Sequence, residues 1–154
     1  MQSDLGGILF PAPDHIGVMV KDADKTIEFL SSILGLGPWL MLEESFDEMW
    51  AGEPFSVKGG HARLGSVVLE ILQPLEKGSL WGQFVETKGE GLHHIAFCFP
   101  NWEETVAKLQ EQGSKMLLGS RFDGKRFCFF ETKPGGIIIE IGEQGIHDRS
   151  YKGL

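Results

Sequence analysis

Cysteine is scarce in this chain of 154 residues: there are two, Cys98 and Cys128, and both lie in apolar runs. They have no metal-type spacing, and two cysteines make no disulfide framework, so we expect reduced thiols in the core. Apolar runs of membrane-spanning length are also missing, which argues against a membrane partner. The start, MQSDLGGILFPAP, lacks the basic segment and the long apolar core of a secretory signal. We therefore expect a cytoplasmic protein.

Basic residues are fewer than acidic ones: 14 Lys and Arg stand against 22 Asp and Glu, a net charge of -8. The two signs are mixed along the chain, which argues against nucleic acid as a partner but leaves room for an anionic small molecule. The composition, 42% hydrophobic and 23% charged, is typical of a soluble globular protein. We expect residues 1–154 to form a single domain, because this length suits one ordinary domain.

One pattern occurs twice along the chain, in DHIGVMVKDADKTIEFLSSILGLG and in HHIAFCFPNWEETVAKLQEQGSK. Each copy begins with a histidine, an isoleucine and a small residue, runs as a short strand, and continues with apolar residues at helical spacing. Three strand candidates follow each helix: 38–45, 60–65 and 67–73 in the first copy, and 115–119, 125–131 and 136–141 in the second. A short helix near 79–87 lies between the copies. The pattern is therefore β-α-β-β-β, twice.

This repetition predicts an α+β fold. Each unit alone is a sheet with one helix on one face, and the sister unit is the obvious cover for the other face. We predict two βαβββ modules, about 13–74 and about 92–143, joined by a linker helix segment at about 75–91. Together they should form a curved, mostly antiparallel sheet around a metal site.

The metal site follows from two carboxylates in apolar strands, Glu70 in VVLEILQ and Glu140 in GGIIIEIGE. An ionised carboxylate in apolar surroundings is costly unless something pairs with it. Strand alternation lets both lie on the concave face, together with His15 and His94 from the first strand of each copy. Two imidazoles and two carboxylates suit a divalent first-row ion. We expect one ion per chain (Co, Ni, Mn or Zn), bound by these four residues.

Other readings of the polar strand residues remain open. A single strand glutamate is usually at an edge or facing water, and a single strand histidine is more often structural than a ligand. The matching positions in two copies favour the metal site. His93 has the wrong parity for that site, so its replacement should be mild. His61 either faces the cavity or is exposed, and His147 lies in a polar tail where we expect it to be solvated.

The segments DHIGVMV, VVLEILQP, GLHHIAF and KPGGIIIEI resemble the vicinal oxygen chelate superfamily over residues 13–143. That superfamily includes glyoxalase I, methylmalonyl-CoA epimerase, fosfomycin-resistance enzymes, extradiol dioxygenases and bleomycin-binding proteins. The stretch LEILQPLEKGSLWGQFVETKGEGLHHIAF is most similar to the epimerases. The resemblance implies the same four ligands, His15, Glu70, His94 and Glu140. We further expect a homodimer.

Two features depart from the epimerase pattern. The second ligand position can be glutamine in epimerases, whereas here it is Glu70, as in glyoxalase I. The segment SFDEMWAGEPFSVKGG is longer and more aromatic than the family pattern, and epimerases are thought to take one catalytic base from this region. The alignment leaves four candidates for that base open: Glu43, Glu44, Glu48 and Glu53.

The resemblance implies a metal-dependent isomerase that chelates its substrate through two oxygens and exchanges the α-proton of a methylmalonyl-CoA-like 2-carboxyacyl-CoA through an enolate. Glu140 would be both ligand and proton carrier. We expect contributions to substrate binding from His61, Lys125, Arg126 and Lys133. The first alternative is a glyoxalase I-type lyase acting on a thiol hemithioacetal. A ring-cleaving dioxygenase would need iron and an open triad that Glu70 would crowd, and a resistance protein that only binds a small molecule would not need four ligands.

Overall fold

The structure, a computed structural model, describes residues 7–154. Residues 1–6, part of the N-terminal segment considered above for secretion, lie outside the described residues. The described elements are, in order, β1 (His15–Met19), α1 (Ala23–Leu34), β2 (Leu40–Phe46), β3 (Phe55–Leu64), β4 (Val67–Pro74), α2 (Leu80–Lys88), β5 (Gly91–Phe99), α3 (Trp102–Glu111), β6 (Lys115–Phe122), β7 (Lys125–Glu131) and β8 (Ile138–Glu143). Each predicted helix and strand is present.

One strand is clearly longer than predicted. β3 begins at Phe55, whereas the sequence pattern placed its start at residue 60. Gly59 and Gly60 resemble a loop signal in the sequence, but here they are strand residues. A side chain at Gly59 would collide with the backbone of Ile71 in β4, so glycine lets the two strands approach each other.

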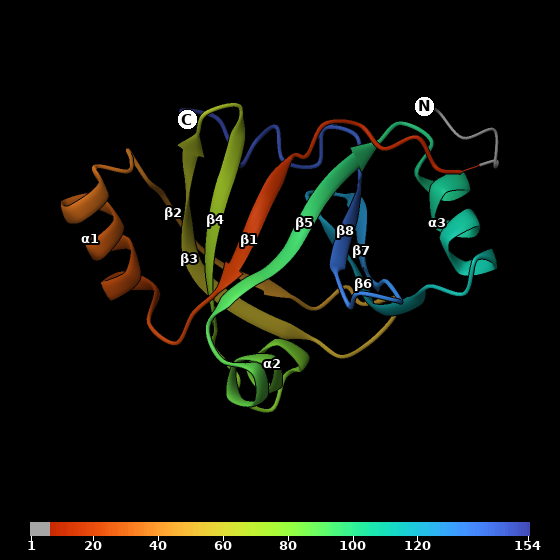
Figure 1. Cartoon of the computed structure of the whole chain (residues 1–154), viewed down its shortest axis with the longest axis horizontal. Coiled ribbons are helices and arrows are strands. Elements are labelled where there is room, and N and C mark those ends of the chain that lie inside the picture. The colour runs from red at the N-terminus through yellow and green to blue at the C-terminus, as the bar shows by residue number, and fades with distance from the viewer. Residues whose placement is uncertain (1–6) are drawn as a thin grey trace.

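The strands form one sheet in the order β2-β3-β4-β1-β5-β8-β7-β6. β1 pairs in parallel with β4 and β5 with β8, whereas the other neighbouring pairs are antiparallel. The first strands of the two modules, β1 and β5, run side by side at the centre and join the halves. The sheet curls into a half-barrel, with α1 and α3 at opposite ends and α2 at its lower edge (Figure 1). The predicted α+β fold with two βαβββ modules is confirmed.

Alternation along the strands divides the core into three clusters. Outer clusters lie under α1, around Ile27 and Ile71, and under α3, around Trp102 and Ile141. The third cluster fills the concave face and includes Trp81 from α2, which is 1% exposed. The polar residues of β1, β4, β5 and β8 on the concave face are therefore surrounded by apolar side chains.

The three helices in residues 7–154 are short. α1 starts at Asp22, whose side chain accepts a hydrogen bond from the backbone N–H of Lys25, and ends at Gly35 in the left-handed conformation. Ser79 caps α2 in the same way by accepting from the backbone N–H of Gly82. In residues 7–154, no helix is long and apolar enough to cross a membrane.

Candidate metal centre

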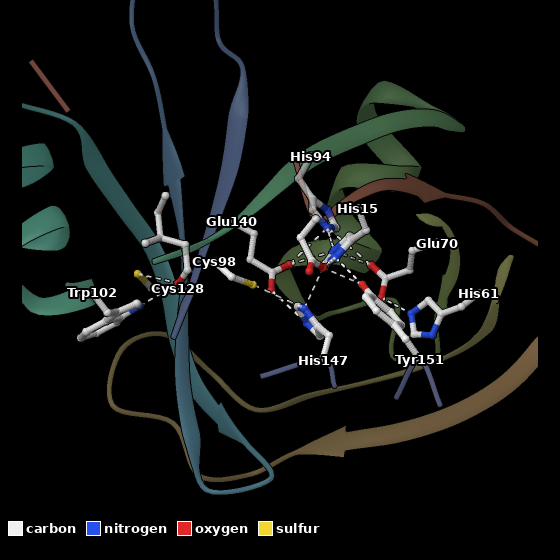
Figure 2. A network of polar contacts seen from close by, with 12 residues as sticks. His15, His61, Glu70, His94, Cys98, Trp102, Cys128, Glu140, His147 and Tyr151 are labelled. Atoms are coloured by element: carbon white, nitrogen blue, oxygen red, sulfur yellow. Dashed lines mark hydrogen bonds and ion pairs between the residues drawn. The ribbon is translucent and has the colours of Figure 1, made fainter. Parts of the chain in front are cut away.

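Four side chains from the four central strands converge on the concave face, and they are the four that the sequence predicted as ligands. His15 lies on β1, Glu70 on β4, His94 on β5 and Glu140 on β8. Gly17 of β1 is in register with both Glu70 and His94. The parallel pairings within each module place one carboxylate beside each central strand. Glu70 and Glu140 therefore lie on opposite sides of the two imidazoles (Figure 2).

The donor atoms are close enough to share one ion. Nε2 of His15 is 3.0 Å from Nε2 of His94. Oε2 of Glu140 is 3.3 and 3.2 Å from these two nitrogens, and Oε2 of Glu70 is 3.3 and 3.5 Å from them. Donors bound to one first-row ion at roughly 2.0–2.2 Å lie about 3 Å apart when they are neighbours. His15, His94 and Glu140 form the tightest group, and Glu70 adds a fourth donor.

Burial makes it energetically costly to keep these side chains charged. His15, His94 and Glu140 are each at most 5% exposed. Burial alone would lower the pKa of His15, but the charges of Glu70 and Glu140 raise it well above its ordinary value. Burial alone would raise the pKa of Glu140, but mainly the charge of His15 lowers it to about 2. With neutral imidazoles the set carries two negative charges, which match a divalent cation.

A carboxylate outside this set orients His15. Oδ2 of Asp14 lies 2.9 Å from Nδ1 of His15. The Tyr151 hydroxyl donates to the same oxygen at 2.7 Å. A carboxylate that accepts the Nδ1 proton leaves Nε2 unprotonated, and this is the usual support of a metal-bound histidine. Burial opposes the ionisation of Asp14, but the hydrogen bonds from His147 and His15 hold its pKa well below its ordinary value.

His61 supports Glu70 in a similar way. The two residues are paired in the β3–β4 ladder, and Nε2 of His61 lies 2.8 Å from Oε1 of Glu70. This contact occupies one carboxylate oxygen and leaves Oε2 directed at the imidazoles. His61 was predicted to bind substrate. The structure places it on the cavity wall, where it also holds a candidate ligand.

The C-terminal tail contributes two residues that sequence reasoning missed. His147 was predicted to be solvated, and that prediction is wrong: its side chain is 13% exposed, and Nδ1 lies 2.9 Å from Oδ2 of Asp14. Nε2 of His147 lies 3.7 Å from Oε1 of Glu140, which is beyond hydrogen-bond distance. Tyr151 stacks against His147 (Figure 2). The tail has no periodic pattern, so the sequence carries no signal that it folds back.

His93 also faces the concave side, which corrects the prediction from strand alternation. Gly17 pairs with His94, but the next residue, Val18, pairs with Leu92. His93 is therefore the extra residue of a β-bulge, and a bulge interrupts the alternation of side chains. Burial and the neighbouring His94 lower the pKa of His93 to about 2.

A cavity of about 530 Å³ opens beside Glu70 and Glu140, two of the four candidate ligands. Its polar wall includes Glu70, Glu140, His61 and His147. Much of the remaining wall is apolar and comes from both modules: Phe46, Phe55, Val57, Leu72, Phe127 and Phe129. This combination of a converging polar cluster and apolar walls is typical of a small-molecule site.

Three basic residues predicted to bind substrate are not among the cavity-lining residues. Arg126 lies on the convex side of β7, over the ring of Trp102, and is paired with Glu103 and Glu143. Lys125 donates to the backbone carbonyl of Gln144. Lys133 is 76% exposed beside Glu131. The sequence showed their charge but not the acidic partners on the outer surface.

Comparisons with known proteins show the family to which the chain belongs. A family model described as Glyoxalase/Bleomycin resistance protein/Dioxygenase superfamily matches residues 14–129. The uncharacterised protein YqjC of Bacillus subtilis (strain 168) is 31% identical over 136 residues, which cover 84% of this chain and 90% of the relative. The superfamily resemblance seen in the sequence is therefore confirmed.

Solved structures of other proteins are also similar to this chain. A hypothetical protein of Bacillus halodurans C-125 is 26% identical with a TM-score of 0.66, covering 86% of this chain and 93% of that chain. A methylmalonyl-CoA epimerase of Streptomyces coelicolor, in complex with 2-nitronate-propionyl-CoA, is 26% identical with a TM-score of 0.67, covering 89% and 99%. The chain is thus similar in sequence to an uncharacterised protein and in structure to an epimerase.

Proposed function

The chain belongs to the Glyoxalase/Bleomycin resistance protein/Dioxygenase superfamily, and from this premise we propose that it is a divalent-metal-dependent epimerase. Its substrate would be a 2-carboxyacyl-CoA that resembles methylmalonyl-CoA, and the reaction an exchange of the α-proton. The observation that carries this proposal is a carboxylate on each of two walls of one cavity, Glu140 in the metal centre and Glu44 on β2. The epimerase structure with a bound acyl-CoA analogue supports the substrate class.

His15, Glu70, His94 and Glu140 would hold the ion. When bound, a divalent cation supplies Lewis-acid stabilisation for negative charge that develops on substrate oxygens. Side chains of the protein itself orient the ligands and exclude water. Asp14 fixes the orientation of His15, and His61 fixes that of Glu70. The apolar side chains of the concave face exclude water from the reacting carbon.

The two carboxylates suit a reaction that removes a proton from one side of a carbon and returns it to the other. Glu140 directs Oε2 to the imidazoles, and its other oxygen remains available to a proton. Glu43 and Glu44 both border the cavity. Glu44 shares the more buried face of β2 with Leu42 and Phe46, whereas Glu43 is on the exposed face, beside Asp24 and Lys58. Strand alternation therefore supports Glu44 among the four bases that the sequence left open.

The test is proton exchange in deuterated water. Protein loaded with cobalt is incubated with methylmalonyl-CoA, and deuterium at the α-carbon is followed by mass spectrometry. We expect uptake above a metal-only control, and its loss in Glu140→Ala, because that side chain is both ligand and proton carrier. Absence of uptake from protein that binds cobalt would overturn the epimerase proposal.

A glyoxalase I-type lyase remains the second candidate. The observation that favours it is Glu70, a carboxylate at a position where epimerases can carry an amide, held here by His61. The same cobalt-loaded protein is assayed with hemithioacetals of glutathione and bacillithiol. Lyase turnover without α-proton exchange on the acyl-CoA would place this function first. The homodimer stays a prediction, which light scattering on the purified protein would check.

A further inference from the structure

His93 has no role in the function proposed above, yet it is buried against the metal centre. It is the extra residue of the β5 bulge, and its ring contacts α2. The ring packs edge-on against Trp81 and Phe84, with centroids 4.1 and 4.5 Å apart. Its Nδ1 lies 2.8 Å from Nδ1 of His94. Bulges frequently re-aim a side chain beside an active site.

The contact between the two Nδ1 atoms constrains where the protons sit. A hydrogen bond needs one donor, so one of the two nitrogens is protonated and the other accepts. A neutral imidazole that binds a cation through Nε2 carries its proton on Nδ1. If Nε2 of His94 is a ligand, Nδ1 of His94 must donate and Nδ1 of His93 must accept.

The surroundings of His93 allow it to be such an acceptor. Its Nε2 is buried and has no hydrogen-bond partner among the described residues. An N–H at this position points among aromatic rings of α2 and β7, whose faces are weak acceptors. Within residues 7–154, no acidic side chain forms a hydrogen bond or an ion pair with the ring that would stabilise a charged form, so His93 is a neutral acceptor.

The two candidate histidine ligands are therefore held differently. His15 donates its Nδ1 proton to a carboxylate, Asp14, whereas the partner of Nδ1 of His94 among the described residues is the neutral ring of His93. A carboxylate acceptor increases the basicity of a ligand, and a neutral one does so less. His93 supplies orientation without adding another negative charge to a site that already contains Glu70 and Glu140.

We propose that His93 is a positioning residue that fixes the tautomer of His94 and so leaves Nε2 of His94 free to bind a divalent cation. This inference rests on the metal-binding part of the proposed function. It reverses the expectation from strand alternation that a replacement of His93 would be mild.

The test compares two variants of the whole chain. His93→Leu keeps an apolar side chain but removes the acceptor, whereas His93→Asn can place Oδ1 where Nδ1 of His93 lies. Metal-free proteins are titrated with Co²⁺, and circular dichroism confirms that each is folded. We expect His93→Leu to bind about 10–100-fold more weakly than the wild type, and His93→Asn to recover most of the affinity.

A second measurement uses the wild type alone. In the Zn²⁺-loaded protein, ¹⁵N shifts of the imidazoles should show a proton on Nδ1 of His94 and on Nε2 of His93. A proton on Nδ1 of His93, or equal Co²⁺ affinity in His93→Leu and the wild type, would refute the inference while metal binding itself stands. If the wild type binds no ion, the metal-dependent function fails and this inference fails with it.

Discussion

The imidazole of His94 fills the space that a side chain at Gly17 would occupy. A Cβ built at Gly17 would collide with the Cε1, Nδ1 and Nε2 atoms of that ring. Gly17 is in register with His94 on one side and with Glu70 on the other, so it lies at the centre of the sheet beneath the candidate metal centre. Glycine is required here because the ring of a candidate ligand lies directly on the backbone.

Gly17→Ala should therefore displace His94 and weaken metal binding strongly. Forcing a methyl group into a filled space costs about 1–3 kcal/mol, which a domain of this size should survive. Co²⁺ titration and thermal unfolding measure the two effects. Gly78→Ala is the matched control, because nothing lies within 4 Å of a Cβ at Gly78. Wild-type cobalt affinity in Gly17→Ala would show that the position of His94 does not determine binding.

Removal of the metal should destabilise the fold. The four candidate ligands come from β1, β4, β5 and β8, so an ion held by them would connect the two modules. An ion that binds only the folded state stabilises it by mass action. At a free ion concentration near 100 times Kd this amounts to about 2.7 kcal/mol, or a shift in Tm on the order of 5–10 °C. Calorimetry with and without a chelator measures the shift. Equal Tm values would mean that the ion does not bind the folded chain at this site.

The metal-induced shift in Tm should grow from pH 6 to pH 8. In the metal-free protein, the carboxylates raise the pKa of His15 and of His94 despite their burial. Their protonated rings stabilise the metal-free fold fully below about pH 6.5, and this contribution is lost as the pH rises through the raised values. The ion needs neutral rings, so protons compete with it most at low pH. A shift that stays constant over this range would contradict this linkage.

The four candidate ligands could be predicted from the sequence because they obey strand alternation in two copies of one pattern. Glu70 and Glu140 each interrupt an apolar strand, and His15 and His94 each begin the repeat. A period of two and a repeated motif are local signals, and the tertiary fold preserves them.

His93 and the tail residues could not be predicted in this way. The bulge in β5 depends on the pairing with β1, and the sequence HHIAF contains no glycine or proline that would indicate it. His147 and Tyr151 reach Asp14 from a segment without helical or strand periodicity. Such contacts depend on the closure of the whole sheet, so single-sequence patterns do not contain them.

Tyr151→Phe should loosen the support of His15 without removing it. The variant loses the hydroxyl that donates to Asp14 but keeps the ring beside His61 and His147. A net loss of about 1 kcal/mol in unfolding free energy is expected for one such hydrogen bond. Metal affinity should fall less than in Asp14→Ala, which removes the acceptor itself. Urea unfolding and Co²⁺ titration give both values, and a larger loss of affinity in Tyr151→Phe than in Asp14→Ala would contradict this order.

The final prediction concerns the second base. Glu44→Gln should abolish epimerisation while leaving metal affinity unchanged, because Glu44 faces the cavity from β2 but is not a candidate ligand. If Glu140 alone serves one side of the carbon, deuterium exchange from one stereoisomer should persist in this variant, whereas conversion between stereoisomers should stop. Glu43→Gln is the matched control: Glu43 also borders the cavity, but it lies on the exposed face of β2, so this variant should behave as the wild type. Chiral analysis of the product acyl groups separates exchange from inversion. Full inversion in Glu44→Gln, or its loss in Glu43→Gln, would show that strand alternation assigns the wrong carboxylate.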